Sequence, residues 1–494
     1  MKRLFLLFVF SVIFISCSSS VPKYTPLKTH GEMLSNYNAF CNLMDTYYPY
    51  FDIVGFNWDS LKNVHRQKLL TITTEDGFVK NIRQMLSAFQ DPHCNIVCPN
   101  DESLFSKLLF HNDDHSFSLI FENILNEYGS LPFRFTIVHN MALVSYIDST
   151  SNEYKEGIRL GMPLEKVDGI PVDKYIEEKY IFAYRKDSRL SKLVNLDLIF
   201  GRPATKTLLG FIDDNGKAIN VNCEYKSENN KYLFNHPALK YISNYKKMQT
   251  LEYGFINNDI GYISIPSFLG VSAPSKIGKL FFWTLDGKES PNVKDFENAL
   301  NELSGTKGLI LDIRNNLGGD ASIGTVMAQY FVSEESPVYS FCFRDGSYPP
   351  DSLYKYTKPY TGYIFSLERE HRKKNYRLYN GQYLKPVVVL QNEGCLSSTE
   401  DFIATLKHIP TVTTLGVNSS GSSSYPQFRP LPNGMYARIP VRRTYWDKDK
   451  LIEKDGIPPD IIVKPSKNDV YLGKDIQLEK AIGLLNNKDS EIKQ

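Results

Sequence analysis

The sequence predicts an α/β protein built from several domains, and three observations lead to that class. Apolar residues early in the chain recur at helical spacing, whereas the middle of the chain is dominated by strand-like segments. From about residue 252 onward, strand-like and helix-like segments alternate. Such alternation is typical of a sheet covered by helices, with functional side chains at strand ends. A chain of 494 residues has room for about three such domains.

Composition and charge limit the classes of function. The chain is 42% hydrophobic and 23% charged, so it has enough apolar residues to build ordinary cores. Its formal net charge is only +2. Binding to nucleic acid needs a clustered basic face, which this balance does not favour. We therefore expect no nucleic-acid partner.

The chain begins with a segment that is typical of a signal peptide. Lys2 and Arg3 precede an apolar run from Leu4 to Ile15, which is too short to span a bilayer comfortably. The small residue before Cys17 resembles the cleavage box of a bacterial lipoprotein, in which Cys17 becomes the lipidated amino terminus. The alternative is an ordinary secretory signal with an incidental cysteine. The predicted segments are a lipoprotein signal peptide at 1–17 and a flexible tether at 18–32.

Residues 33–110 are predicted to form a helical domain. Its clearest segment is "TTEDGFVKNIRQMLSAFQD" (73–91), whose apolar residues lie on one helical face that we expect to be core. The residues of that face are Phe78, Ile82, Met85, Leu86 and Phe89.

Residues 115–230 have the alternating pattern of strands. The segment "GIRLGMPLEKVDGIPV" (157–172) reads as a turn, an apolar stretch and a second glycine turn. This part of the chain is therefore predicted to be a β-rich domain. Its strand-like segments are 133–140, 141–148 and 217–225.

Residues 240–490 are predicted to form the α/β core. "GLILDIRNNLGG" (308–319) is a buried strand that runs into a glycine-rich turn, and "PVVVLQNEG" (386–394) is a second buried strand. Each is followed by a helix-like segment. The remaining predicted elements are a strand at 261–266 and helices at 292–303, 322–332 and 474–485.

The cysteines do not indicate a metal site. His93, Cys94 and Cys98 lie close together, but no second pair of ligands stands at the spacing of a zinc site. Export would permit disulfides, but the sequence cannot assign pairs. We expect buried free thiols at the six cysteines that remain after Cys17, namely Cys41, Cys94, Cys98, Cys223, Cys342 and Cys395.

The stretch "QNEGCLSSTED" (391–401) offers three hydroxyl groups between a strand and a helix. Ser397 with Glu400 has the spacing of a capping box, which is a structural explanation for both residues. Ser397 also ends the turn at the mouth of the helix, where backbone N–H groups and the helix dipole favour a negative oxygen. It is therefore the preferred nucleophile over Ser398 and Thr399. The capping and catalytic roles are compatible at one residue.

Several motifs in a fixed order resemble the carboxyl-terminal processing and tricorn-type serine peptidases. The resemblance implies a helical cap, a PDZ-like domain and an α/β core of the ClpP-crotonase type. It covers most of the chain after the tether. The motifs are "YYPYFDIVGFNWDSL" (47–61), "MLSAFQDPHCNIV" (85–97), "GIRLGMPLEKVDGIPV" (157–172), "LILDIRNNLGGD" (309–320), "VVVLQNEGCLSSTEDFIATLK" (387–407) and "DGIPPDIIV" (455–463).

The resemblance also implies how the nucleophile is activated. Its Ser-x-x-Glu motif falls on Ser397. In the processing-protease branch a lysine is the base, but Ser422 stands at that place here, and Lys407 is better explained as a charge at the helix end. The tricorn-type branch uses a histidine in an Asp-Gly-His-Thr-like motif. "QDPHCN" (90–95) places His93 there, with proline for glycine and cysteine for threonine.

The same resemblance implies the other site residues. A glutamate before the late motif would orient the histidine, which indicates Glu453, with Asp455 as the neighbouring alternative. Either could instead be a solvated charge in a polar loop. The oxyanion would be bound by the backbone N–H of Gly318 or Gly319 and of Ser398.

These inferences predict a lipid-anchored serine endopeptidase of the bacterial cell envelope. It would cleave unfolded or C-terminally exposed polypeptides, and its PDZ-like domain would bind a peptide terminus by strand addition. No cofactor or metal is required by this chemistry. The alternatives are a catalytically inactive peptide-binding lipoprotein on the same fold and a non-proteolytic ligand carrier.

Overall fold

The computed structural model describes the chain in nine segments. The predicted signal peptide, Cys17 and residues 18–21 of the predicted tether lie outside them. No helix among the described residues has the length and apolar character needed to cross a membrane. The described segments are 22–99, 129–179, 185–227, 240–268, 290–333, 336–345, 355–356, 360–363 and 382–486.

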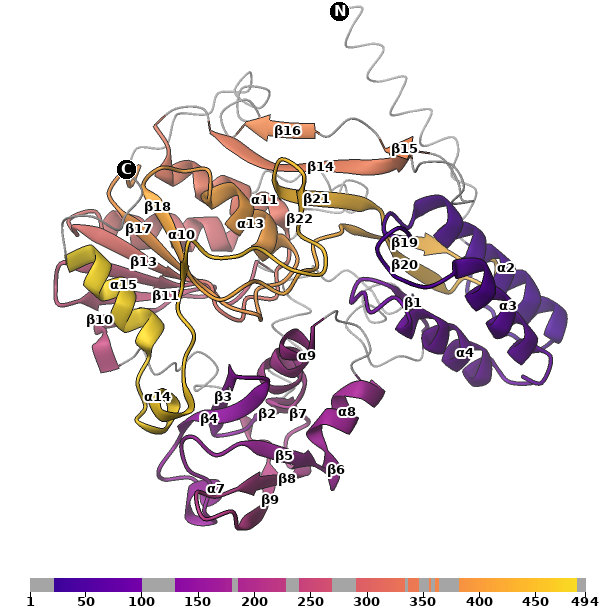
Figure 1. Ribbon diagram of the computed structural model, residues 1–494, viewed down its shortest axis with the longest axis horizontal. Helices are drawn as coiled ribbons and strands as arrows, with labels where there is room; N and C mark the ends of the chain where they lie inside the picture. Colours follow the sequence, from indigo (N-terminus) through magenta and orange to yellow (C-terminus); the bar gives the residue numbers. More distant parts are fainter. Residues whose placement is uncertain are drawn as a thin grey trace, which may run out of the picture.

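A seven-stranded sheet forms the centre of the carboxyl-terminal half (Figure 1). Its strand order is β10-β11-β12-β13-β17-β18-β23, and every pair from β12 to β23 is parallel. The carboxyl ends of parallel strands therefore meet at one edge. The strands are β10 (Ser243–Lys247), β11 (Glu252–Ile256), β12 (Ile260–Ser264), β13 (Gly308–Asp312), β17 (Val387–Gln391), β18 (Val412–Gly416) and β23 (Ile461–Ile462).

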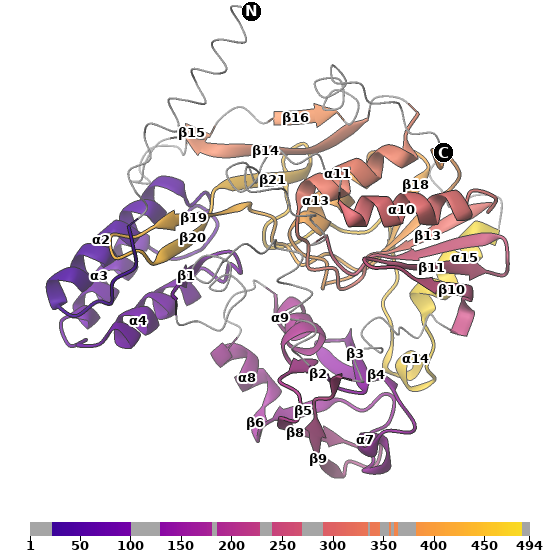
Figure 2. The ribbon, with the colours of Figure 1, turned by 180° about the vertical axis from the view of Figure 1, so that it is seen from behind.

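Both faces of this sheet are covered by helices, as Figure 2 shows. Alternate residues of each strand enter different cores, so Leu309 packs under the α10, α11 and α13 layer while Ile310 packs against α15. Burial on both faces explains why these strands are continuous apolar runs. The helices are α10 (Pro291–Glu302), α11 (Ala321–Ala328), α13 (Ser398–Leu406) and α15 (Ile476–Asn486), with a short helix α14 (Lys467–Tyr471) before α15.

The amino-terminal helices share a core with a hairpin from far along the chain. Phe40 and Phe78 pack in one cluster with Met435 and Ile439. The strand after the third helix pairs with this hairpin, as Asn95 opposite Arg438 illustrates. The helical unit is therefore completed by residues near 430. Its elements are α2 (His30–Tyr47), α3 (Trp58–Leu69), α4 (Glu75–Ser87), β1 (Asn95–Val97), β19 (Pro426–Pro430) and β20 (Tyr436–Pro440).

Residues 129–227 form the β-rich unit, with its own core around Phe133, Leu209 and Phe211. Its main sheet has the order β6-β5-β8-β9 beside the hairpin β3–β4. The elements are β2 (Gly129–Ser130), β3 (Phe133–Val138), β4 (Met141–Ile147), α7 (Asn152–Lys155), β5 (Leu164–Val167), β6 (Ile170–Pro171), α8 (Val172–Lys179), α9 (Lys186–Lys192), β7 (Phe200–Gly201), β8 (Lys206–Ile212) and β9 (Ala218–Glu224).

A further sheet lies beside α13, and Cys342 on its long strand pairs with Arg443. Its strands are β14 (Pro337–Asp345), β15 (Lys355–Tyr356), β16 (Tyr360–Tyr363), β21 (Arg442–Asp447) and β22 (Lys450–Leu451). Together these elements confirm the predicted class, which is a multidomain α/β chain with amino-terminal helices. All six cysteines of the described residues are free and buried.

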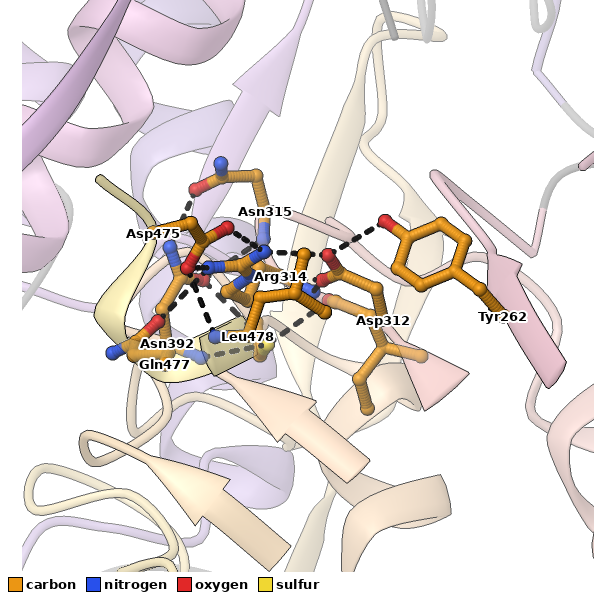
Figure 3. A network of polar contacts seen from close by, with 10 residues as sticks. Tyr262, Asp312, Arg314, Asn315, Asn392, Asp475, Gln477 and Leu478 are labelled. Carbon is orange, nitrogen blue, oxygen red and sulfur yellow. Dashed lines mark hydrogen bonds and ion pairs between the residues drawn. The ribbon is translucent and has the colours of Figure 1, made fainter. Parts of the chain in front are cut away.

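A buried ion-pair network fixes the turn after β13 to the start of α15 (Figure 3). The Arg314 guanidinium contacts Asp312 at 2.6 Å and Asp475 at 2.8 Å. Tyr262 donates to the same oxygen of Asp312, Oδ2, at 2.9 Å. Asp312 is 1% exposed, so its charge is compensated inside the protein. The network therefore holds the glycine-rich turn in place relative to the sheet.

Candidate active site

Ser397 lies in a strained turn between β17 and α13. Its φ of 59° and ψ of −127° fall where only glycine is at ease. Its backbone N–H donates to the Ser422 carbonyl oxygen at 2.9 Å and lies 3.3 Å from a Glu400 carboxylate oxygen. Glu400 thus provides the acidic half of the capping pair that the sequence predicted. A serine forced into this conformation at a helix start resembles the strand-to-helix nucleophile elbow of α/β-hydrolases.

Glu400 anchors the loop that faces Ser397. Its carboxylate accepts the Ser419 hydroxyl at 2.6 Å and the N–H groups of Gly421 and Ser422 at 2.7 and 2.8 Å. The side chain is fully buried, and this burial raises the pKa of Glu400 to about 7, against the opposing effect of those hydrogen bonds. One carboxyl group therefore sets the position of residues 419–422, which we call the serine loop.

The glycine-rich turn after β13 lies against Ser397. A Cβ atom on Gly318 would lie 2.9 Å from both the Ser397 Cβ and the Ser398 nitrogen, so only glycine fits. The Gly318 N–H donates to the Asn316 side chain at 2.9 Å and is already engaged. Among the described residues, the N–H groups of Gly319 and Ser398 have no hydrogen-bond acceptor. These two N–H groups are the available donors beside the Ser397 side chain.

His93 reaches the serine loop from the helical unit. It follows α4 and is 3% exposed. Its Nδ1 lies 2.8 Å from the Ser422 hydroxyl and 3.0 Å from the Ser424 hydroxyl. Burial lowers the pKa of His93, and the nearby Arg438 adds to this, while Asp91 opposes it. The neutral imidazole is therefore favoured near neutral pH.

Two buried carboxyl groups lie beside His93. Asp91 Oδ1 is 3.6 Å from His93 Nδ1 and accepts the His93 backbone N–H at 2.8 Å. One potential ligand atom from each of Asp91, His93 and Glu453 lies within 4.8 Å of the others. Glu453 accepts the Ser423 N–H at 3.1 Å. Burial raises the pKa of Glu453 well above its ordinary value, and the charges of Asp91 and Glu400 raise it further.

Comparison with protein-family models shows what a chain with this geometry is similar to. Residues 259–463 match the model of Peptidase family S41, and residues 29–87 match the Tricorn protease C1 domain. The segment that carries Ser397 is thus a Peptidase family S41 domain. The matched region contains Ser397, Gly319 and Glu453, whereas His93 lies just beyond the matched amino-terminal segment.

Individual relatives of this chain are distant. It is 23% identical over 199 residues to the carboxy-terminal processing protease CtpB of Bacillus subtilis, covering 40% of this chain and 36% of that protein. It is 22% identical over 423 residues to the carboxy-terminal-processing protease of Bartonella bacilliformis, covering 83% of this chain and 81% of that protein. The chain thus spans little more than a third of the length of the first curated relatives it matches.

A solved structure supports the fold over nearly the whole chain. The crystal structure of mature CPAF superimposes with a TM-score of 0.62 at 15% identity, and the match covers 94% of this chain and 99% of CPAF. At this identity the likeness concerns the fold alone. It supports a single architecture running from the amino-terminal helices to the carboxyl-terminal helix.

The alternative residues that the sequence offered lie elsewhere in the chain. Lys407 follows the last residue of α13, and its ammonium group lies 2.7 Å from Asp460 and 3.0 Å from the Pro458 carbonyl oxygen, so it links the end of α13 to the segment before β23. Asp455 is exposed, whereas Glu453 is 3% exposed and belongs to the cluster around His93. The structure therefore brings together Ser397, Ser422, His93 and Glu453, and it separates Lys407 and Asp455 from them.

Sequence reasoning missed two parts of this site. Asp91 was visible only as the acid two residues before His93, and its burial gave no signal in the sequence. The Ser424 hydroxyl was hidden in a serine-rich loop that reads as a flexible connection. The Asp401 side chain also supports the loop, because it accepts the Ser423 hydroxyl at 2.5 Å and pairs with Arg442 at 2.8 Å.

Proposed function

We propose that the chain is a serine-type endopeptidase that hydrolyses polypeptides through an acyl-enzyme. The observation that carries this proposal is the double role of Ser422. Its carbonyl oxygen accepts the Ser397 N–H, and its hydroxyl contacts His93 Nδ1. Ser422 thus contacts both the strained turn that carries the Ser397 hydroxyl and the buried neutral imidazole of His93. Acyl transfer needs such a nucleophile and base at close range.

In this proposal His93 is the general base and Ser397 is the nucleophile. A proton on Nδ1 that is donated to a serine hydroxyl or to Asp91 leaves the Nε2 lone pair to accept the Ser397 proton. The serine oxygen then attacks the peptide carbonyl carbon. The N–H groups of Gly319 and Ser398 would bind the developing oxyanion.

The remaining steps follow from proton balance. The imidazolium gives its proton to the leaving amine, which departs and leaves an ester on Ser397. Water then attacks this ester with His93 again acting as base. Glu453 and Asp91 would stabilise the imidazolium because both carboxyl groups lie within the His93 cluster.

We further propose polypeptide substrates in the cell envelope. The relatives of the chain include bacterial proteins named carboxy-terminal processing proteases, and the β-rich unit is proposed to be PDZ-like and to hold a peptide terminus. Cys17 would carry a lipid that anchors the chain, with 1–17 as the signal peptide. Globomycin-sensitive processing and labelling of the wild type with a palmitate analogue, but not of Cys17→Ala, would test the anchor.

The second candidate is an inactive peptide-binding lipoprotein. One observation favours it: in the described part of the chain, the hydrogen bonds of the His93 ring run through Nδ1, and none joins Nε2 to Ser397. Catalytic hydrogen bonds are often incomplete without substrate, so this does not exclude the enzyme.

Cleavage of an unfolded protein substrate separates the two candidates. The wild type should cleave it. Ser397→Ala or His93→Ala should lower the rate by at least about 10³-fold, because the proposed nucleophile and base act together and neither works without the other. Ser398→Ala is the matched control, since it deletes the neighbouring hydroxyl and keeps the backbone N–H. It should lower the rate far less. Folded Ser397→Ala protein with wild-type cleavage would overturn the proposal.

A further inference from the structure

The cluster of Asp91, His93 and Glu453 places two buried carboxyl groups beside one imidazole. All three side chains are buried, with exposures of 0%, 3% and 3%. Within the described residues, Asp91 Oδ2 and Glu453 Oε1 have no hydrogen-bond partner that meets geometric criteria. The hydroxyl of the nearby Tyr50 donates to the Arg442 carbonyl oxygen at 2.8 Å. Two buried carboxyl groups beside each other require a proton or a cation between them.

Arg438 provides a positive charge next to the cluster. Arg438 lies beside Asp91, and one arm of its guanidinium donates to the Pro92 carbonyl oxygen at 3.0 Å. The unpartnered oxygens Asp91 Oδ2 and Glu453 Oε1 are available to a cation that enters the cluster.

We propose that Asp91, His93 and Glu453 bind one Zn²⁺ ion reversibly and that the bound ion switches the peptidase off. The ligands would be one carboxylate oxygen from each acid and the Nδ1 atom of His93. The ion-binding half of this proposal is independent of the proposed function, and only the inhibitory half rests on it.

The distances suit a tetrahedral ion. Zinc ligands at about 2.1 Å from the metal lie about 3.4 Å from one another in a tetrahedral site. His93 Nδ1 and Asp91 Oδ1 are 3.6 Å apart, close to that value. All three ligand atoms lie within 4.8 Å of one another, so side-chain shifts of about 1 Å would bring them to tetrahedral spacing. The Ser422 or Ser424 hydroxyl, or a water molecule, would fill the fourth position.

The inhibitory effect follows from the tautomers of imidazole. A neutral imidazole carries one proton, and a metal bound to the Nδ1 lone pair leaves that proton on Nε2. The nitrogen that should accept the Ser397 proton is then already protonated. The ion does not need to enter the space where the peptide binds. Zinc should therefore lower kcat and leave KM unchanged.

Binding is tested first, with ZnCl₂ titrated into the purified full chain by calorimetry. We expect one ion per chain in the wild type and in Ser397→Ala. Asp91→Asn and Glu453→Gln, which keep the side-chain shape, should each weaken binding by at least about tenfold. Asp455→Asn is the matched control, because Asp455 is an exposed acid two residues from Glu453, and its affinity should equal that of the wild type.

Co²⁺ replaces zinc in a second measurement that needs no variant. Its visible spectrum should show a low-coordinate nitrogen and oxygen site without the intense charge-transfer band of a thiolate ligand, although Cys94 lies nearby. Equal zinc affinity in Asp91→Asn and the wild type, absence of binding to the wild type, or a thiolate band would overturn the site.

Kinetics then test the inhibitory half. Zinc should lower kcat of the wild type at constant KM, and a chelator should restore it. If the chain binds zinc and cleaves no substrate, the site stands and the proposed peptidase function fails. If cleavage continues at the same kcat with zinc bound, the site stands and the inhibition is overturned.

Discussion

Ser422 joins two segments that lie far apart in the sequence. It contacts His93 through its hydroxyl and Ser397 through its carbonyl oxygen, and its N–H is held by Glu400. The sequence marked Ser422 only as the position where a lysine was missing. At the residue scale, this hydroxyl contacts His93 Nδ1 at 2.8 Å and so helps to hold the imidazole in place.

The pH dependence of cleavage should report the state of His93. Because burial lowers its pKa below the ordinary value of 6.5, the base remains neutral as the pH falls to that value. We expect kcat/KM to be constant near neutral pH and to fall only as the pH drops through a pKa below 6.5. An acid limb at or above about pH 7 in the pH–rate profile would contradict this assignment.

Gly318→Ala should abolish activity and destabilise the fold. Its φ is +89°, and a Cβ atom would lie 2.7 Å from the Leu396 carbonyl oxygen, so the nucleophile turn must shift. Gly216→Ala is the matched control, since Gly216 has a φ of +78° with open space around the added atom. Gly216→Ala should lower the free energy of unfolding by about 1–2 kcal/mol and keep wild-type cleavage. Equal loss of cleavage in both variants would show that backbone strain alone is responsible.

Glu400→Gln tests the anchor of the serine loop. An amide has one acceptor oxygen, so it cannot satisfy the Ser419 hydroxyl and the N–H groups of Gly421 and Ser422 together. We expect cleavage to fall by at least about 100-fold and stability by about 2 kcal/mol. Rates and urea denaturation would be measured on the same preparation. Wild-type values for both would mean that the loop holds its position without this carboxylate.

At the element scale, the apolar strands needed helices on both faces, and α15 supplies the second face. Leu478 and Leu485 of this helix pack on the side of the sheet opposite α13. The Arg314 network places the start of α15 against the turn that carries Gly318 and Gly319. The carboxyl-terminal helix therefore helps to position Gly318 and Gly319, the second of which carries a proposed oxyanion donor.

The Arg314 network should contribute far more to the free energy of unfolding than an exposed ion pair does. Arg314→Ala leaves the buried Asp312 carboxylate without its partner, and we expect a loss of about 3–5 kcal/mol in unfolding free energy. Lys246→Ala breaks an exposed pair with Glu302 and should cost less than about 1 kcal/mol. Urea denaturation of both variants measures the difference. Similar values would show that the buried network is not a structural anchor.

At the scale of the whole molecule, the β-rich unit contacts the core beside the nucleophile turn. Arg185 donates to the carbonyl oxygens of Ser419 and Asp455, and Asn195 reaches Asn315 in the turn after β13 at 3.2 Å. The buried Glu393 lies in the nucleophile turn near Arg185 and Asp187. Units that were predicted as separate domains therefore meet at the site.

The free energy of unfolding should fall as the pH rises through the range in which Glu393 loses its proton. Burial raises its pKa to about 7, so the folded protein holds a proton that the unfolded chain releases near pH 4.5. This contribution is complete below pH 4.5 and is lost as the pH rises towards 7. Between about pH 4.5 and 7.5, Glu393→Gln should therefore lose on the order of 2–3 kcal/mol less than the wild type. If the unfolding free energies of the wild type and Glu393→Gln change with pH in parallel, this prediction is wrong.

The sequence by itself determined the layered α/β class and the order of the core elements. The buried runs around Ile310 and Val388 could be predicted, as could the helical face that contains Phe78 and Ile82. Both kinds of pattern follow from residues that are neighbours along the chain, because periodicity is a local property. The turn at Ser397 could be predicted for the same reason, since strand, turn and helix are consecutive there.

Only the tertiary structure decided which residues surround the nucleophile. Ser422, His93 and Glu453 come from three separate parts of the chain, and the buried position of Asp91 depends on a hairpin near residue 430 that completes the helical unit. The engagement of the Gly318 N–H by Asn316 was equally invisible in the sequence. Contacts of this kind depend on long-range packing, which no local pattern of residue types encodes.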